Sequence, residues 1–161
     1  MIYFEAKDFP KEGLEATGEG VAVRVPAGTP RRVYELFGDK DGNIIVKGKG
    51  KGHALRSGAG KGDAVRSGAG KGSALRSGSG DGHALRSGSG KGHAKRVGKG
   101  KGDAVRWGSG KGFAERWGEG TGYAERHGSG DGDAERWGHG AGNALRWGSG
   151  KGRAYLNGEK Q

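Results

Sequence analysis

The 161-residue chain contains 40 glycines and no cysteine, and only 30% of its residues are hydrophobic. The lack of cysteine excludes disulfide staples and thiol chemistry, and no apolar stretch has the length of a membrane-spanning helix. The formal net charge of +11 is unevenly distributed, because residues 1–46 carry −2 and residues 47–161 carry +13. A basic excess of this kind favours acidic partners such as nucleic acid, anionic glycans or acidic proteins.

The first 40 residues hold most of the bulky apolar side chains that lie outside the repeats, among them Ile2, Phe4 and Phe9. An outlying copy of the repeat occupies residues 19–28, with Ala22 and Arg24 in register with the repeat's Ala and Arg. Terminal units of a repeat protein must cover exposed core and unpaired strand edges. We therefore predict that residues 1–40 form an N-terminal cap and residues 41–161 form the repeat domain.

From Lys51 to Gly150 the chain is ten consecutive decapeptides of the pattern x-G-x-A-x-R-x-G-x-G. Degenerate copies flank this array at residues 41–50 and 151–160. Every even position is Gly, Ala or Arg and every odd position varies, and a period of two indicates extended chain with alternating faces. We expect an all-β, single-chain β-solenoid of about eleven to twelve ten-residue coils, a rod on the order of 55 Å long.

The variable face of each repeat is predicted to point outward. Its fifth position includes Glu115, Glu125 and Glu135, and a buried unpaired charge costs several kcal/mol. The Gly and Ala face must then point inward and form a thin core.

The invariant arginines, Arg56 to Arg146, fall on this inward face, where a Gly/Ala interior has no room for them. Two alternatives remain open. Each Arg sits at a corner, where its five donors satisfy carbonyl oxygens of its own and neighbouring coils, or the arginines point outward and bind a polyanion.

The first and seventh positions of the repeat supply the candidate binding residues. The first is mostly Lys, and the seventh ends in the four tryptophans of the chain. Trp beside Arg offers stacking for bases or sugars, or an anchor for a protein. We expect a partner-binding surface formed by Lys51, Lys61, Lys71, Lys91, Lys101, Lys111, Trp107, Trp117, Trp137, Trp147, Arg106, Arg116, Arg136 and Arg146.

Two further patterns concern oligomerisation and metal binding. The aliphatic run Leu55, Val65, Leu75 and Leu85 is expected to lie under the cap or in an oligomer contact. His83 and His93 should be ladder neighbours, but two histidines without further ligands are a weak metal signal. No irregular pocket interrupts the array, so we expect a non-enzymatic protein without metal or cofactor.

The unit Gly102–Gly110, with Ala104, Arg106 and Trp107, resembles the glycine-rich decapeptide repeats of small proteins encoded by bacteriophages and prophages. The resemblance covers about two thirds of the chain. It implies a viral accessory, anti-defence or host-recognition role.

Our leading hypothesis is an interaction protein whose basic, Trp-bearing rod engages a nucleic acid or a host nucleoprotein complex. One alternative is a fibre or adhesin that binds host surface glycans through the tryptophans, and another is a structural spacer. The first residues lack a basic region followed by an apolar run. We therefore expect the cytoplasm of an infected bacterial host, or the virion surface under the adhesin alternative.

Overall fold

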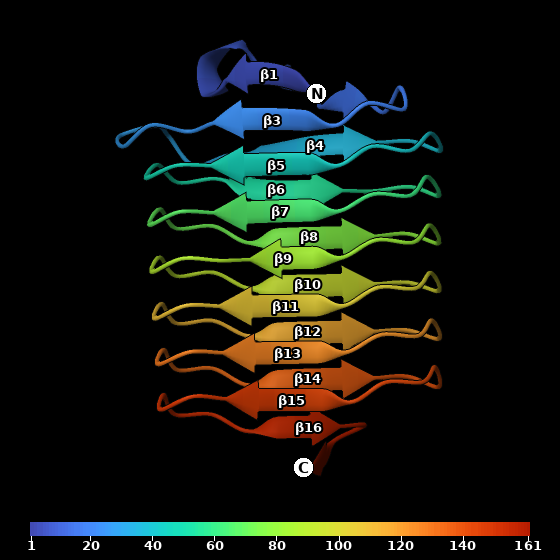
Figure 1. The fold of residues 1–161 in the computed structure, drawn as a ribbon. Coiled ribbons are helices and arrows are strands. Elements are labelled where there is room, and N and C mark those ends of the chain that lie inside the picture. Colours follow the sequence, from blue (N-terminus) through green and yellow to red (C-terminus); the bar gives the residue numbers. More distant parts are fainter.

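The computed structural model describes all residues from Met1 to Gln161 as a column of stacked, flattened β-coils (Figure 1). Two parallel sheets form its walls, and the only helical element is a three-residue 3-10 turn, η1 (Ala6–Asp8). Sheet A contains β1 (Ile2–Glu5), β3 (Val21–Arg24), β5 (Ile44–Lys47), β7 (Ala64–Ser67), β9 (Ala84–Arg86), β11 (Ala104–Trp107), β13 (Ala124–His127) and β15 (Ala144–Trp147). Sheet B contains β2 (Leu14–Glu15), β4 (Val33–Phe37), β6 (His53–Arg56), β8 (Ala74–Ser77), β10 (Ala94–Val97), β12 (Ala114–Trp117), β14 (Ala134–Trp137), β16 (Ala154–Leu156) and β17 (Glu159–Lys160).

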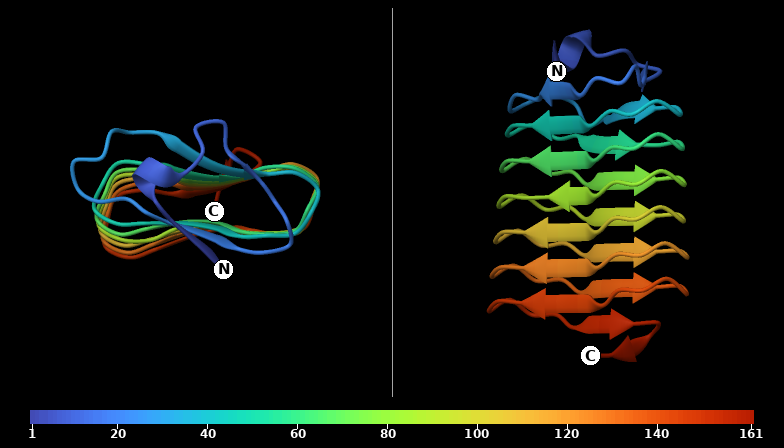
Figure 2. Two further views of the ribbon diagram at one scale, coloured as in Figure 1. Left: turned by 90° about the horizontal axis from the view of Figure 1, so that it is seen from above. Right: turned by 45° about the vertical axis from the view of Figure 1, so that its right-hand side comes forward.

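Each coil of the solenoid consists of two decapeptides, one in each sheet. Ala94 pairs with Ala74 on one side and with Ala114 on the other, twenty residues away in both directions. The β-solenoid is thus confirmed, but the ten-residue coil was wrong: sheet A has eight strands, and the rod is roughly 35–40 Å long. A decapeptide supplies only one strand of four residues and one glycine-rich turn, so two are needed to close a coil (Figure 2).

The turns at the two edges explain the invariant glycines. Gly108 and Gly112 have φ of +110° and +153°, which residues with a side chain rarely adopt. A Cβ on Gly110 would lie 2.2 Å from the carbonyl oxygen of Gly90 in the coil before. The turns can therefore stack at the spacing of a β-ladder only when these positions carry no side chain.

The interior contains alanine, as expected, but also the arginines. Ala94 and Ala104 are fully buried, and so are Arg96 and Arg106. The expectation that the interior has no room for guanidinium groups was wrong, because a twenty-residue coil encloses a wider interior than a ten-residue one.

Each buried guanidinium donates to carbonyl oxygens of a glycine turn. Arg96 donates from Nε to Gly82 at 2.9 Å, from Nη1 to Gly78 at 3.3 Å and from Nη2 to Gly80 at 2.9 Å. These three glycines form the turn of the coil before, and Nη1 also donates to the carbonyl of Val97 in its own coil. The first of the two alternatives is therefore confirmed, with each Arg side chain lying in a corner and satisfying carbonyls of two coils.

The first coils have a conventional apolar core instead. Val21 and Val23 pair with Ile44 and Val46, and all four are buried. In the next coil of sheet A the same inward positions are Ala64 and Arg66. β1 to β4 therefore belong to the same two sheets as the array, although they lie within the predicted cap of residues 1–40.

The register of the outlying repeat differs from the prediction. Ala22 and Arg24 were expected in the positions of the inward Ala and Arg, but they pair with Ile45 and Lys47, which face outward. Arg24 is exposed and donates from Nε to Glu5 at 2.9 Å. The bulky valines on either side of Ala22 bury more apolar surface, which fixes the register.

The end of the apolar core is covered by residues 6–10. Phe9 is 2% exposed and packs edge-on against Tyr34. Arg32 fastens this segment, because it donates from Nη2 to the carbonyl of Pro10 at 2.8 Å and lies 4.9 Å from the Tyr34 ring centroid. At the other end, β17 folds back antiparallel onto β16. No helix of the structure is long and apolar enough to cross a membrane.

Because successive repeats alternate between the sheets, two predicted ladders do not exist. Leu55 and Leu75 lie on sheet B, whereas Val65 and Leu85 lie on sheet A, so these four residues form no single oligomer stripe. His83 precedes a strand of sheet A and His93 one of sheet B, so they are not ladder neighbours.

We predict that Arg96→Ala destabilises the protein by about 3 kcal/mol or more, because it leaves several buried carbonyl groups without a donor. Lys91→Ala removes the same charge from an exposed turn and should change stability by less than about 0.5 kcal/mol. Urea unfolding of both variants measures the difference. Equal stability of the two variants would contradict the structural role of the arginine.

A candidate anion-binding edge

The two edges of the solenoid carry different charges. The turns that follow sheet A, on the left in Figure 1, form what we call the basic edge. Its first repeat position holds Lys51, Lys71, Lys91, Lys111, Asp131 and Lys151. The turns that follow sheet B form the mixed edge, where the same position holds Asp41, Lys61, Asp81, Lys101, Thr121 and Ala141. The single lysine stripe predicted from sequence is thus wrong, because Lys61 and Lys101 lie on the opposite edge from the other four.

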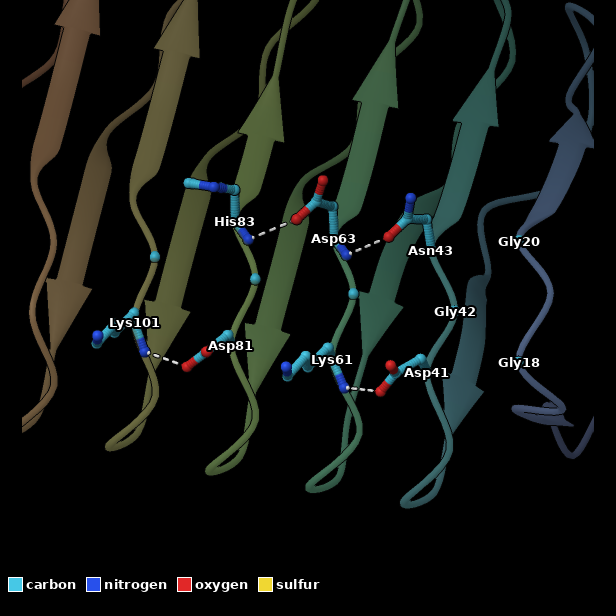
Figure 3. Close-up of a pocket in the computed structure, with 13 residues that line it drawn as sticks. Gly18, Gly20, Asp41, Gly42, Asn43, Lys61, Asp63, Asp81, His83 and Lys101 are labelled. Atoms are coloured by element: carbon cyan, nitrogen blue, oxygen red, sulfur yellow. Dashed lines mark hydrogen bonds between the residues drawn. The ribbon is translucent and has the colours of Figure 1, made fainter.

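A groove floored by glycine runs along the mixed edge (Figure 3). Its rims are ladders in which a side-chain oxygen accepts a hydrogen bond from a backbone amide of the next coil. Asp41 Oδ1 accepts from the amide of Lys61, and Asp81 Oδ1 from that of Lys101, both at 2.8 Å. On the other rim, Asp63 Oδ1 accepts from the amide of His83 at 2.8 Å. Where the coil before carries Asp at the first or third repeat position, the backbone amide of the next coil therefore donates to an anionic oxygen.

On the basic edge, side chains of the coil before satisfy several third-position amides. Ser73 Oγ accepts from the amide of His93 at 3.1 Å, and His93 Nδ1 accepts from that of Phe113 at 3.0 Å.

At the first position, a lysine in the coil before offers no acceptor, so the amides of Lys71, Lys91 and Lys111 make no hydrogen bond within the protein. On the mixed edge the amides of Asp81 and Thr121 are free for the same reason. Where the coil before carries Asp131, its Oδ1 accepts from the amide of Lys151 at 2.9 Å. An external anion can take the place of this carboxylate in the other coils.

A column of buried arginines lies beneath the basic edge. Arg66, Arg86 and Arg106 donate to the glycine turns of this edge. Burial, together with Arg106 and Arg66, lowers the pKa of Arg86 to about 9, so its guanidinium remains charged at neutral pH.

Carboxylates balance the arginine column of the mixed edge more closely than that of the basic edge. Asp63 and Asp81 raise the pKa of Arg76, opposing the larger effect of burial, which lowers it to about 10. No carboxylate acts in this way on Arg86 or Arg106. The positive potential of the basic edge is therefore least compensated around Arg86 and Arg106.

The predicted binding arginines supply charge and not contacts. Arg106, Arg116 and Arg136 are fully buried, with their donors directed at backbone carbonyls, and Arg146 is half-buried in the last full coil. Their placement in a partner-contacting surface was wrong, because a guanidinium that satisfies a buried glycine turn cannot also reach a ligand.

The four tryptophans are divided between the edges and do not form one ladder. Trp107 and Trp147 lie on sheet A beside the basic edge, where they are 50% and 52% exposed. Trp117 and Trp137 lie on sheet B beside the mixed edge and stack on each other, with ring centroids 5.2 Å apart. The indole nitrogens of this pair donate to Glu115 and Glu135, so these two rings brace neighbouring coils.

Two features escaped the sequence-based prediction: the free first-position amides, which occur on both edges, and the segregation of lysine on the basic edge. Both follow from the twenty-residue coil. The lysine column is visible in the sequence when every second repeat is read, since Lys51, Lys71, Lys91 and Lys111 then follow one another without an acidic residue. No group of three or more His, Asp or Glu side chains is arranged to hold a metal ion.

We predict that His53 and His93 make folding sensitive to mild acid. Burial is the largest effect and lowers the pKa of both rings, and nearby cations lower it further, while Glu115 partly opposes this lowering at His93. As the pH falls, these histidines are therefore protonated at a higher pH in the unfolded chain than in the folded protein. The free energy of unfolding decreases as the pH drops below about 6.5 towards the folded-state pKa. The double variant His53→Ser/His93→Ser keeps an acceptor, as Ser73 does, but does not titrate.

The measurement is the unfolding free energy at pH 7 and pH 5. The wild type should lose more stability than the serine variant between these values. An equal loss in both proteins would show that neither ring is kept neutral by the fold.

Comparison with known proteins adds no relative: no protein-family model matches the chain, and no curated protein or solved structure is significantly similar to it.

Proposed function

We propose that the basic edge binds a nucleic-acid strand through its phosphates. The observation that carries this proposal is the segregation of exposed lysines on one edge, where they lie beside free backbone amides and above Arg86 and Arg106, on which no carboxylate acts. Lysine and backbone N–H groups are common phosphate ligands, and neither reads a base. The binding is therefore proposed to depend little on sequence.

The length of the edge suits several phosphates. From Lys51 to Lys151 the column spans five coil steps, about 24 Å, over which one strand of a duplex carries about seven phosphates. The step between coils does not match the step between phosphates. Lysine tolerates this mismatch, because its ammonium is a point charge on a flexible stem.

Aromatic rings flank the basic edge where bases of a bound strand would lie. Trp107 and Trp147 are half exposed on one side, and Phe113 is partly exposed on the other and stacked on His93. Bases stack on such rings in proteins that bind single strands. This arrangement favours a single strand over a duplex, whose bases are already stacked.

The likeness of the repeats to phage-encoded decapeptides fits an accessory or anti-defence factor that acts on host nucleic acid or nucleoprotein. The alternative of an adhesin relied on one continuous ladder of four tryptophans, which the division between the edges removes. A purely structural spacer would bind no polyanion in the assay below.

We predict that Lys71→Asp/Lys91→Asp weakens binding of a 20-nucleotide oligo-dT at least tenfold in 50 mM salt. The slope of log K against log salt should become shallower by about 1.4, because two phosphate contacts are lost. Asp already occupies this position in both edges, at Asp81 and Asp131, so the variant should fold. Fluorescence anisotropy over a salt series provides the measurement.

The matched control is Lys61→Asp/Lys101→Asp, which makes the same charge change on the mixed edge. It should weaken binding less than threefold. Equal losses in the two variants would assign the effect to net charge alone. If the wild type binds neither oligo-dT nor duplex DNA in 50 mM salt, the proposed function is wrong.

A further inference from the structure

A basic pocket closes the N-terminal end of the basic edge. The loop between β3 and β4 projects beyond the regular turns at this end of the edge (Figure 1). Together with the first turns it encloses about 420 Å³. Four of the eight lining residues are Arg31, Lys49, Lys51 and Lys71, and none of the eight is acidic or hydrophobic. Elsewhere the edge presents at most one lysine per coil, so the density of positive charge is highest here.

The Arg31 guanidinium in this pocket is free to bind a ligand. Its Nε donates to Nε2 of His53 at 2.8 Å, and burial and Arg31 both lower the pKa of this ring, which favours the neutral form that can accept. The two Nη groups have no carboxylate partner in the pocket, so their donors can meet a ligand.

The loop that forms the far wall is held in place before any ligand binds. The amide and hydroxyl of Thr29 donate to the carbonyl of Pro26 at 3.3 Å and 2.7 Å. The amide of Gly50 donates to the carbonyl of Val25 at 3.0 Å, which fixes the loop to the first turn of the edge. A pocket ordered in this way loses little conformational entropy on binding.

We propose that this pocket binds the terminal phosphate of the nucleic-acid strand that lies along the basic edge. This inference rests on the proposed function. A terminal phosphate monoester carries about −1.5 to −2 charges near pH 7, more than the single charge of an internal diester. The most concentrated group of cations on the edge fits that greater charge. An Arg guanidinium binds phosphate oxygens in a bidentate manner, and Arg31 is the one such group exposed here.

The position of the loop favours binding of a phosphate at the end of the strand over binding of a phosphate within the strand. A strand that follows the lysine column towards the N-terminus meets residues 28–31, which form the pocket wall across its path. The protein would then recognise the end of a strand in addition to its phosphate backbone.

The test compares three oligo-dT strands of 12 nucleotides that differ only in their ends: a 5′-phosphate, a 3′-phosphate, or hydroxyls at both. One of the two phosphorylated strands should bind the wild type at least fivefold more tightly than the hydroxyl strand. Arg31→Gln/Lys49→Gln should abolish this preference and leave the affinity for the hydroxyl strand within about twofold. Both residues lie outside the lysine column, which keeps the two effects separate.

The outcomes distinguish the inference from the proposed function. Equal binding of all three strands to the wild type overturns the terminal-phosphate site, and the edge still binds nucleic acid. A preference that persists in the double variant also overturns it, since the phosphate is then bound elsewhere. If none of the three strands binds, both the proposed function and this inference fail.

Discussion

The fold depends on the hydrogen bonds between buried guanidinium groups and the carbonyl oxygens of glycine turns. Each turn directs several carbonyls inward, where they would be costly without a donor, and the five donors of an arginine match them. Arg126, for example, donates to Gly108, Gly110 and Gly112 in the coil before and to Gly130 in its own. The same residue therefore fills the interior, ties successive coils together and accounts for the invariance of Arg and Gly.

The buried arginines place a column of like charges inside the protein, and negative groups must balance this charge. In the mixed edge, carboxylates such as Asp63, Asp81 and Asp103 lie near the arginine column. In the basic edge, Asp131 is the only acidic residue at the first repeat position. A bound polyanion would complete the charge balance there, so that ligand binding and stability would support each other. The structural arginines and the binding lysines are thus two parts of one electrostatic arrangement.

The period of two and the glutamates at the fifth position were sufficient to predict a β-solenoid with alanine inside. The invariant positions alone could not reveal the coil length, because repeats in the two sheets share one pattern and a ten-residue period fits both ten and twenty residues per coil. That ambiguity led to the single Trp ladder and the single lysine stripe. The differences between alternate repeats, such as Lys91 and Lys111 against Asp81 and Lys101, carried the missing information. The terminal pocket could not be predicted, since the loop of residues 28–31 meets Lys49 and Lys71 only through the coil geometry.

The pairing of residues twenty apart is the central claim, because the room for arginine and the separation of the two edges both require it. The chain has no native cysteine, so disulfide formation can test this pairing directly. Leu75→Cys/Lys95→Cys places the two thiols on neighbouring strands of sheet B, whereas Leu75→Cys/Leu85→Cys places them on opposite sheets. A disulfide requires Cα atoms about 4.4–6.8 Å apart. Mild oxidation should cross-link the 75/95 pair within one chain and leave the 75/85 pair reduced, and the reverse pattern would contradict this architecture.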